Sequence, residues 1–155
     1  CVRQSLAQLA KEFDCNDPVF LAIDSPIDSI GVIISYGGAT PGTSTQMSME
    51  PYCNKLLSEM GMGNCSPREV PFRDNIDYNS LALTAEESTK YRSGVGGIGW
   101  LSNTARCDLA FTFSRLGSHL SSPTKSTMAA LLQALRYTQG TKHYKLVMDL
   151  SITTL

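Results

Sequence analysis

Three glycines carry the letters of a nucleotide-binding loop: Gly94, Gly96 and Gly99 spell G-x-G-x-x-G within "YRSGVGGIGWLSNTARCDLAF". A dinucleotide loop of this kind follows a strand, opens a helix, and is completed about 20 residues later by an acidic residue that binds the ribose. Here the preceding segment is polar and helical in character, and no acidic residue ends a strand at that distance. We therefore predict that the match is coincidental and that the chain binds no nucleotide cofactor.

The same glycines need a structural explanation, because a glycine inside a helix costs roughly 1 kcal/mol relative to alanine. Gly96 and Gly99 lie about one helical turn apart, and together they would leave one face of the backbone bare. We predict that both pack at close range against another helix, a strand or a phosphodiester backbone.

Patterns for catalysis or metal binding are missing from the sequence. Two-metal polymerase or nuclease chemistry needs clustered carboxylates, and the chain has no Asp-Asp or Asp-x-Asp pair. Glu86 and Glu87 are better explained as a helix N-terminus, which favours negative charge. His119 and His143 belong to no catalytic spacing, and the five cysteines form no C-x-x-C pair. We predict no catalytic residue, no metal site and no cofactor, with cysteines that act as small buried hydrophobes in a reducing compartment.

Charge is distributed unevenly, although the net charge is only −1. Residues 1–90 carry 6 Lys or Arg against 12 Asp or Glu, whereas residues 91–145 carry 7 cations and one acid, Asp108. Such asymmetry predicts either a surface that faces a polyanion or two halves that neutralise each other across their interface, and the sequence leaves both open. The candidate nucleic-acid-binding cations are Arg92, Arg106, Arg115, Lys125, Arg136, Lys142 and Lys145.

The first part of the chain predicts a short helix and a pair of strands. Apolar residues at spacings of three and four indicate a helix over residues 5–13. Two runs rich in β-branched residues indicate strands at 19–23 and 30–36. The segment 37–46 is rich in Gly, Thr and Pro and predicts a loop.

Four further helices have recognisable boundaries or faces. One covers residues 51–60 and stops at Gly61, and another begins with a capping box at Thr84. The next lies near Arg106 and has an apolar stripe with Thr112, Arg115 and His119 on its other faces; the stripe comprises Leu109, Phe113, Leu116 and Leu120. The last has Ser122 as its N-cap, Pro123 in its first turn and Gly140 at its end.

These elements predict an α+β fold in which a short strand pair with flanking helices precedes a small helical subdomain of about three helices and a terminal strand. The strand is expected at residues 144–150. We expect an α/β segment at 1–65, an extended linker at 66–83, the helical subdomain at 84–143, and the terminal strand and tail at 144–155.

The second half also carries a set of family motifs. The segment from Tyr91 to Val147 resembles the part of copia-type retrotransposon polyproteins that lies after the polymerase palm of the reverse transcriptase and before RNase H. The matching elements are Tyr-Arg-Ser-x-Val-Gly at Tyr91–Gly96, Thr-Arg-Pro-Asp-Ile at Ala105–Leu109, Asn-Pro-Thr at Ser122–Thr124, and Leu-Arg-Tyr-Leu-x-Gly-Thr at Leu135–Thr141. With the upstream segments "FLAID" and "YCNKLLSEMGMGNCSP", the resemblance covers about 135 residues from Phe20 on.

The chain departs from this family in several places. Cys107 replaces a proline, Thr127 stands where a histidine is usual, and Leu132 and Gln133 occupy positions that are usually basic. The segment "GGATPGTSTQMSM" looks like an insertion or a rewritten strand. These departures indicate decay or reuse of the ancestral element.

The resemblance implies a palm end followed by a thumb or connection, bracketed by two active sites that would lie outside the chain. Our first hypothesis is a non-catalytic fragment or remnant of a copia-type reverse transcriptase, whose inherited role is to grip the phosphate backbone of an RNA–DNA hybrid or duplex. The alternative is a reused structural or protein-interaction subunit of a larger assembly with no nucleic-acid role. We expect a protein partner over the palm strands, no membrane span and an intracellular location.

Overall fold

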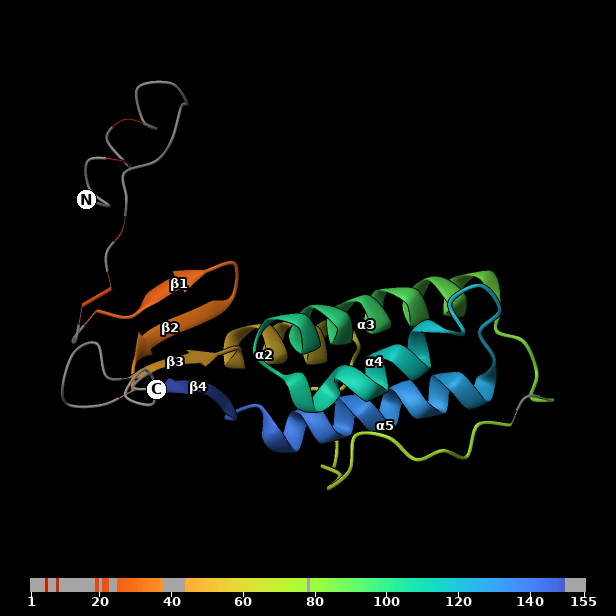
Figure 1. Ribbon diagram of the computed structural model, residues 1–155. Coiled ribbons are helices and arrows are strands. Elements are labelled where there is room, and N and C mark those ends of the chain that lie inside the picture. Colours follow the sequence, from red (N-terminus) through yellow and green to blue (C-terminus); the bar gives the residue numbers. More distant parts are fainter. Residues whose placement is uncertain are drawn as a thin grey trace, which may run out of the picture.

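The computed structural model describes residues 25–37, 44–77 and 79–149, together with Ser5, Gln8, Val19, Leu21 and Ala22. Figure 1 shows a sheet at one end of the molecule and a layer of helices that extends away from it. The helix predicted over residues 5–13 lies outside the described residues, except for Ser5 and Gln8, which are helical. Within the described ranges, no helix is both long enough and apolar enough to cross a membrane.

The sheet contains four antiparallel strands in the order β1-β2-β3-β4. The strands are β1 (Ile27–Ser29), β2 (Val32–Tyr36), β3 (Ser44–Ser48) and β4 (Lys145–Asp149). The predicted terminal strand is confirmed in β4, which pairs with β3 along its whole length, from Ser44 opposite Asp149 to Ser48 opposite Lys145. The sheet is therefore completed only when the chain returns from the helices.

The β1–β2 hairpin corrects one predicted strand. Its two-residue turn has positive φ at Ile30 (55°) and Gly31 (80°), the type I′ geometry that matches the twist of the flanking strands. The partner of β2 is therefore segment 27–29, which lies between the two strands that we predicted, and not segment 19–23. Of the described residues in 19–23, Ala22 forms an isolated bridge with Ser25 and none belongs to a named strand.

Strand β3 corrects the last three residues of the predicted loop 37–46. Its sequence, STQMS, has weak strand character by composition, but β2 and β4 pair with it on both sides. Met47 packs against the core between Ile34 and Leu146, its neighbours on the flanking strands. Pairing on two edges outweighs the local preference of polar residues for a loop.

Helix α2 (Glu50–Glu59) confirms the helix predicted over residues 51–60. Pro51 lies in its first turn, and Gly61, with a φ of 72°, ends it in a left-handed conformation that glycine adopts readily. The buried side of α2 comprises Cys53, Leu56 and Leu57, and all three belong to the hydrophobic core.

The second half folds into three α-helices and one 3₁₀ turn: α3 (Ala85–Thr104), η1 (Cys107–Leu109), α4 (Ala110–Gly117) and α5 (Lys125–Thr141). The capping box at Thr84 and Glu87 is confirmed. The predicted cap at Ser122 is wrong, because Thr124 is the N-cap of α5 and forms a capping box with Thr127. In α4, Thr112 is fully buried beside the apolar stripe, where we had expected it on another face.

One core joins the two halves of the chain. Leu56 and Leu57 of α2 belong to the same buried cluster as Val95, Ile98 and Leu135 from α3 and α5. The described part of the linker 66–83 contains no helix and no named strand, and it lies along α5 through several hydrogen bonds. These bonds are Arg68 N to Arg136 O, Gln133 Nε2 to Val70 O, Leu83 N to Pro123 O and Lys125 N to Leu81 O. The fold class is α+β, and its division into subdomains stays a prediction.

Candidate nucleic-acid interface

The structure removes Arg106 from the candidate phosphate-binding cations, since its side chain is only 2% exposed. It lies at the start of η1, where its guanidinium Nε and Nη2 donate to the two carboxylate oxygens of Asp108 at 3.0 and 2.7 Å. Its Nη1 and Nη2 also donate to the backbone oxygen and the Oγ1 of Thr141, at 3.0 and 2.6 Å. A cation held in this way inside the fold positions helices and does not reach a phosphate.

Aromatic rings complete the site around Arg106. Its guanidinium carbon lies 5.8 Å from the ring centroid of Tyr137 and 5.4 Å from that of Tyr144, within the range of cation–π attraction. The Tyr137 hydroxyl donates to Oδ2 of Asp108 at 2.9 Å. Burial alone would raise the pKa of Asp108, but the hydrogen bonds and charge of Arg106 outweigh burial and lower that pKa below its usual value. Arg106 is therefore a buried cation that is held by a partly exposed carboxylate.

Two further candidates form ion pairs with the acidic half of the chain. Nη2 of Arg115 lies 3.2 Å from Oδ1 of Asp74, and Nζ of Lys125 contacts Oε1 of Glu87. The hydrogen bond from Lys125 is the largest cause of the lowered pKa of Glu87. Both pairs join residues 91–145 to residues 1–90, which favours mutual neutralisation over a free polyanion-facing surface.

The other four candidates have neutral partners or a half-buried position. Nε of Arg92 donates to the backbone oxygen of Leu120 at 3.0 Å. Nζ of Lys142 donates to Oδ1 of Asn54 at 3.0 Å, and that of Lys145 to Oε1 of Gln46 at 3.4 Å. Arg136 is half-buried, and its Nε has no hydrogen-bond partner. Arg92, Lys142 and Lys145 thus keep charge that these contacts do not neutralise.

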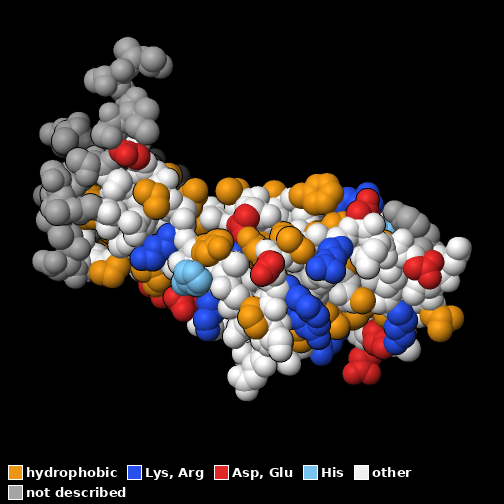
Figure 2. Space-filling view, turned by 90° about the horizontal axis from the view of Figure 1, so that it is seen from below, with side chains coloured by type: hydrophobic (Ala, Val, Ile, Leu, Met, Phe, Trp, Pro, Cys, Tyr) orange, Lys and Arg blue, Asp and Glu red, His pale blue; other side chains and the backbone are white. Residues whose placement is uncertain are grey.

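The candidate cations do not form one continuous stripe. Lys125 begins α5, while Lys142 follows its end, so the 17 residues of this helix separate them by about 26 Å at 1.5 Å per residue. On the face shown in Figure 2, Lys and Arg side chains are separated by hydrophobic and acidic side chains. These residues would therefore contact the phosphate backbone of a nucleic acid at a few separate points.

The glycines pack closely, but not at both predicted positions. A Cβ added to Gly99 would lie 2.6 Å from the ring of Phe113, whereas one added to Gly96 would meet nothing within 4 Å. Gly96 is exposed, so its predicted close-packing role is wrong. Two neighbours make the close approaches that we missed: Gly97 faces Leu56 of α2, and Gly94 faces Leu131 of α5 and Met60. The glycines allow α3 to pack closely against α2, which precedes it in the chain, and against α4 and α5, which follow it.

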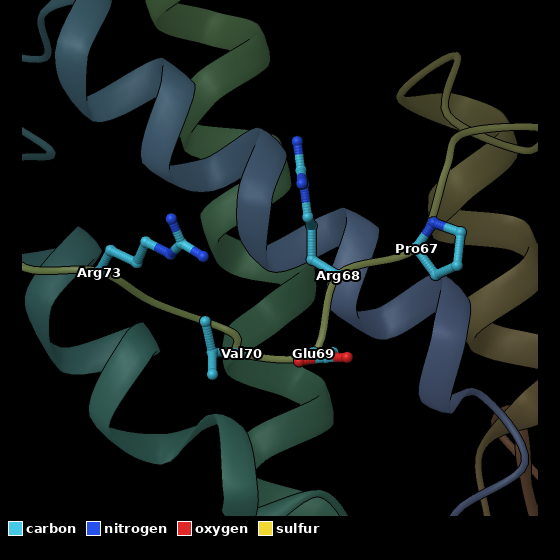
Figure 3. Close-up of a pocket in the computed structure, with 5 residues that line it drawn as sticks. All are labelled: Pro67, Arg68, Glu69, Val70 and Arg73. Carbon is cyan, nitrogen blue, oxygen red and sulfur yellow. The ribbon is translucent and has the colours of Figure 1, made fainter.

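A cavity of about 240 Å³ lies beside the linker, where Figure 3 shows Arg68 and Arg73 extending to the same side of the chain. Pro67, Glu69 and Val70 complete its lining. Both arginines belong to the acidic half of the chain and are not among the cations predicted from the sequence. The only available signal was their position in a linker with two prolines, which is weak.

The described residues contain no group of three His, Cys, Asp or Glu side chains that could hold a metal ion. Cys53 is buried, Cys65 half-buried and Cys107 exposed, and all three are free thiols. The ring of His143 contacts that of Tyr144 edge-on, with centroids 5.1 Å apart. None of these contacts places a nucleophile beside a base. The absence of an enzymatic activity stays a prediction.

The fold and the site define an α+β protein whose helical layer is tied together by a buried arginine network. No protein-family model and no solved structure matches the chain. Over 97 residues, the chain is 29% identical to the uncharacterized mitochondrial protein AtMg00810 of Arabidopsis thaliana. The matched segment makes up 61% of this chain and 39% of that protein. The chain thus spans well under half the length of this relative. The similarity supports the retrotransposon-related origin that the copia-type motifs indicate.

Proposed function

We propose that this chain is a non-catalytic remnant of a copia-type reverse transcriptase that retains a weak grip on the phosphate backbone of a template–primer duplex. One observation supports the proposed ancestry: residues of the different copia-type motifs contact each other inside the fold. Arg106 and Asp108 of one motif bond Thr141 and Tyr137 of another. Tyr91, from a third motif, is fully buried, and its hydroxyl donates to the backbone oxygen of Leu116 at 2.8 Å.

The grip itself depends on a reduced set of cations. Arg106 is buried, and Arg115 and Lys125 are paired with acids, so Arg92, Lys142 and Lys145 remain as the main contributors. Three phosphate contacts predict a log–log salt slope of about −3 at most, since each duplex phosphate contributes about −0.9. Binding should therefore be independent of sequence and lost near physiological salt.

A titration of a labelled RNA–DNA hybrid at about 50 and about 150 mM salt tests the grip. Replacing both lysines (Lys142→Ala with Lys145→Ala) should weaken binding and make the slope shallower by about 2, because two phosphate contacts disappear. The matched control is Lys55→Ala, which removes an exposed cation on α2 that pairs with Glu59. Because the control removes one charge and the test variant two, a control loss of about half that of the double variant would show that only net charge matters. Absence of binding at about 50 mM salt would reject the grip.

The second candidate is a structural subunit without a nucleic-acid role. The ion pairs Arg115–Asp74 and Lys125–Glu87 favour it, because they use cations of the helical half to hold the rest of the chain. Failure of the hybrid to bind at low salt would leave this candidate standing.

Both candidates predict that the chain has no polymerase or nuclease activity. The sequence has no paired aspartates for two metal ions. Primer extension and hybrid cleavage should not exceed a mock preparation with Mg²⁺ or Mn²⁺. Extension by the purified chain would contradict the proposal.

A further inference from the structure

Strand β4 forms an edge of the sheet in the described part of the chain. It stands last in the strand order and pairs with β3 on one side. Two of its apolar side chains are exposed, Val147 at 54% and Met148 at 42%. An edge strand with exposed apolar residues offers its outward N–H and C=O groups to another strand.

The sequence of β4 is complementary to itself. Read as Lys-Leu-Val-Met-Asp, it has a cation at one end, an acid at the other and apolar residues between them. If two copies pair antiparallel about Val147, each Lys145 lies opposite Asp149 of the other copy, and each Leu146 lies opposite Met148. Opposite charges and apolar residues in such cross-strand positions stabilise a sheet.

The backbone geometry permits this arrangement. Antiparallel strands contain opposite pairs of two kinds, with and without mutual hydrogen bonds, and a two-fold axis can pass through either kind. The axis therefore fits Val147 whichever way its backbone groups point. In Figure 1 the helices extend beyond the end of the sheet where β4 begins, so an antiparallel partner would carry its helices away from the opposite end.

We propose that β4 pairs with β4 of a second copy of this chain, so that two four-stranded sheets form one continuous sheet around a two-fold axis at Val147. The charge pattern selects this occupant, because a strand of the same sequence places an opposite charge across from each end of β4. A contact of only five residues per strand is small. Dissociation in the micromolar range is expected for so small an interface.

Sedimentation equilibrium of the full chain, without nucleic acid and from about 5 to about 500 µM, brackets that range. The variant Lys145→Glu places like charges opposite each other at two symmetric positions and should weaken the dimer about tenfold or more. Adding Asp149→Lys restores opposite charges and should recover most of the affinity. The control Lys90→Glu makes the same charge change at an exposed position on α3 and should leave the affinity unchanged.

Hydrogen exchange provides a measurement that needs no variant. Outward-facing amides of β4 should gain protection as the protein concentration rises. A chain that stays monomeric over the whole range overturns the proposal. So does a dimer that Lys145→Glu leaves intact, or a loss that the double charge exchange fails to restore.

Discussion

Arg106 and Asp108 face each other across a single residue and still form a two-pronged ion pair, with Nε–Oδ1 at 3.0 Å and Nη2–Oδ2 at 2.7 Å. The turn of η1 brings the two side chains together, and Thr141 at the end of α5 accepts two further hydrogen bonds from the guanidinium. A short motif thereby fixes the junction between α3 and α4 to the far end of α5. Removing either charge leaves the other one buried or short of partners.

The variant Asp108→Asn should therefore lower the free energy of unfolding by about 3 kcal/mol, the range seen when one partner of a buried ion pair is removed. The side chain of Asp108 is 32% exposed, so water offsets part of the loss. Urea denaturation measures the change. The matched control is Asp74→Asn, which breaks a pair whose acid is 71% exposed and should cost below about 1 kcal/mol. Equal shifts in the two variants would contradict a special role for the buried pair.

The second prediction is that substitutions at two glycines of α3 change the stability of the fold in opposite directions. Gly97→Leu should destabilise the fold by about 1–3 kcal/mol, because its Cβ alone would already clash with Leu56. Gly96→Ala should stabilise it by up to about 1 kcal/mol, since the new methyl group meets open space and alanine favours the helix. Thermal melting of both variants tests the pair. Destabilisation by Gly96→Ala would show that this position is packed after all.

The start of α5 gives a third prediction. The backbone N of Thr127 donates to Oγ1 of Thr124 at 3.3 Å, and the backbone N of Thr124 donates to Oγ1 of Thr127 at 2.9 Å. Thr124→Ala should therefore cost about 0.5–2 kcal/mol. Ser122→Ala, at the position that the sequence favoured, should be nearly neutral. Chemical denaturation of the two variants measures which residue is the cap.

Local signals explain which parts of the fold the sequence predicts well. The capping box at Thr84, the stop at Gly61 and the terminal strand all depend on neighbours in the chain, and the structure has all three. β3 was missed because its stability comes from β2 and from β4, which lies about 100 residues later. Short-range patterns contain no information on that pairing.

The candidate site shows the same limit. Charge counting grouped Arg106 with the exposed cations, because the sequence does not show that Thr141 and Tyr137 enclose it. The close-packing glycines were predicted as a group, but the choice between Gly96 and Gly97 depends on the rotation of α3 about its axis. That rotation is fixed by contact with Leu56 on α2, a tertiary relationship that helical periodicity alone leaves open.

The last prediction concerns alkaline pH. Burial raises the pKa of the Cys53 thiol to about 11, although the nearby Arg106 guanidinium acts in the opposite direction. An unfolded chain loses this proton near the ordinary value of about 8.5, so between that pH and about 11 the folded state binds more protons than the unfolded state. Stability contributed by the neutral thiol is thus fully present below about pH 8.5 and declines as the pH rises, by about 1 kcal/mol per unit. Burial also raises the pKa of Tyr91 and Tyr137, so their ionisation lowers stability further at higher pH.

Urea denaturation of the native chain and of Cys53→Ala at pH 7.5 to about 10 isolates the contribution of the thiol. The variant should be less stable at pH 7.5 because a buried side chain is truncated, but its stability should fall less steeply with pH. Parallel pH profiles would show that Cys53 ionises equally easily in both states.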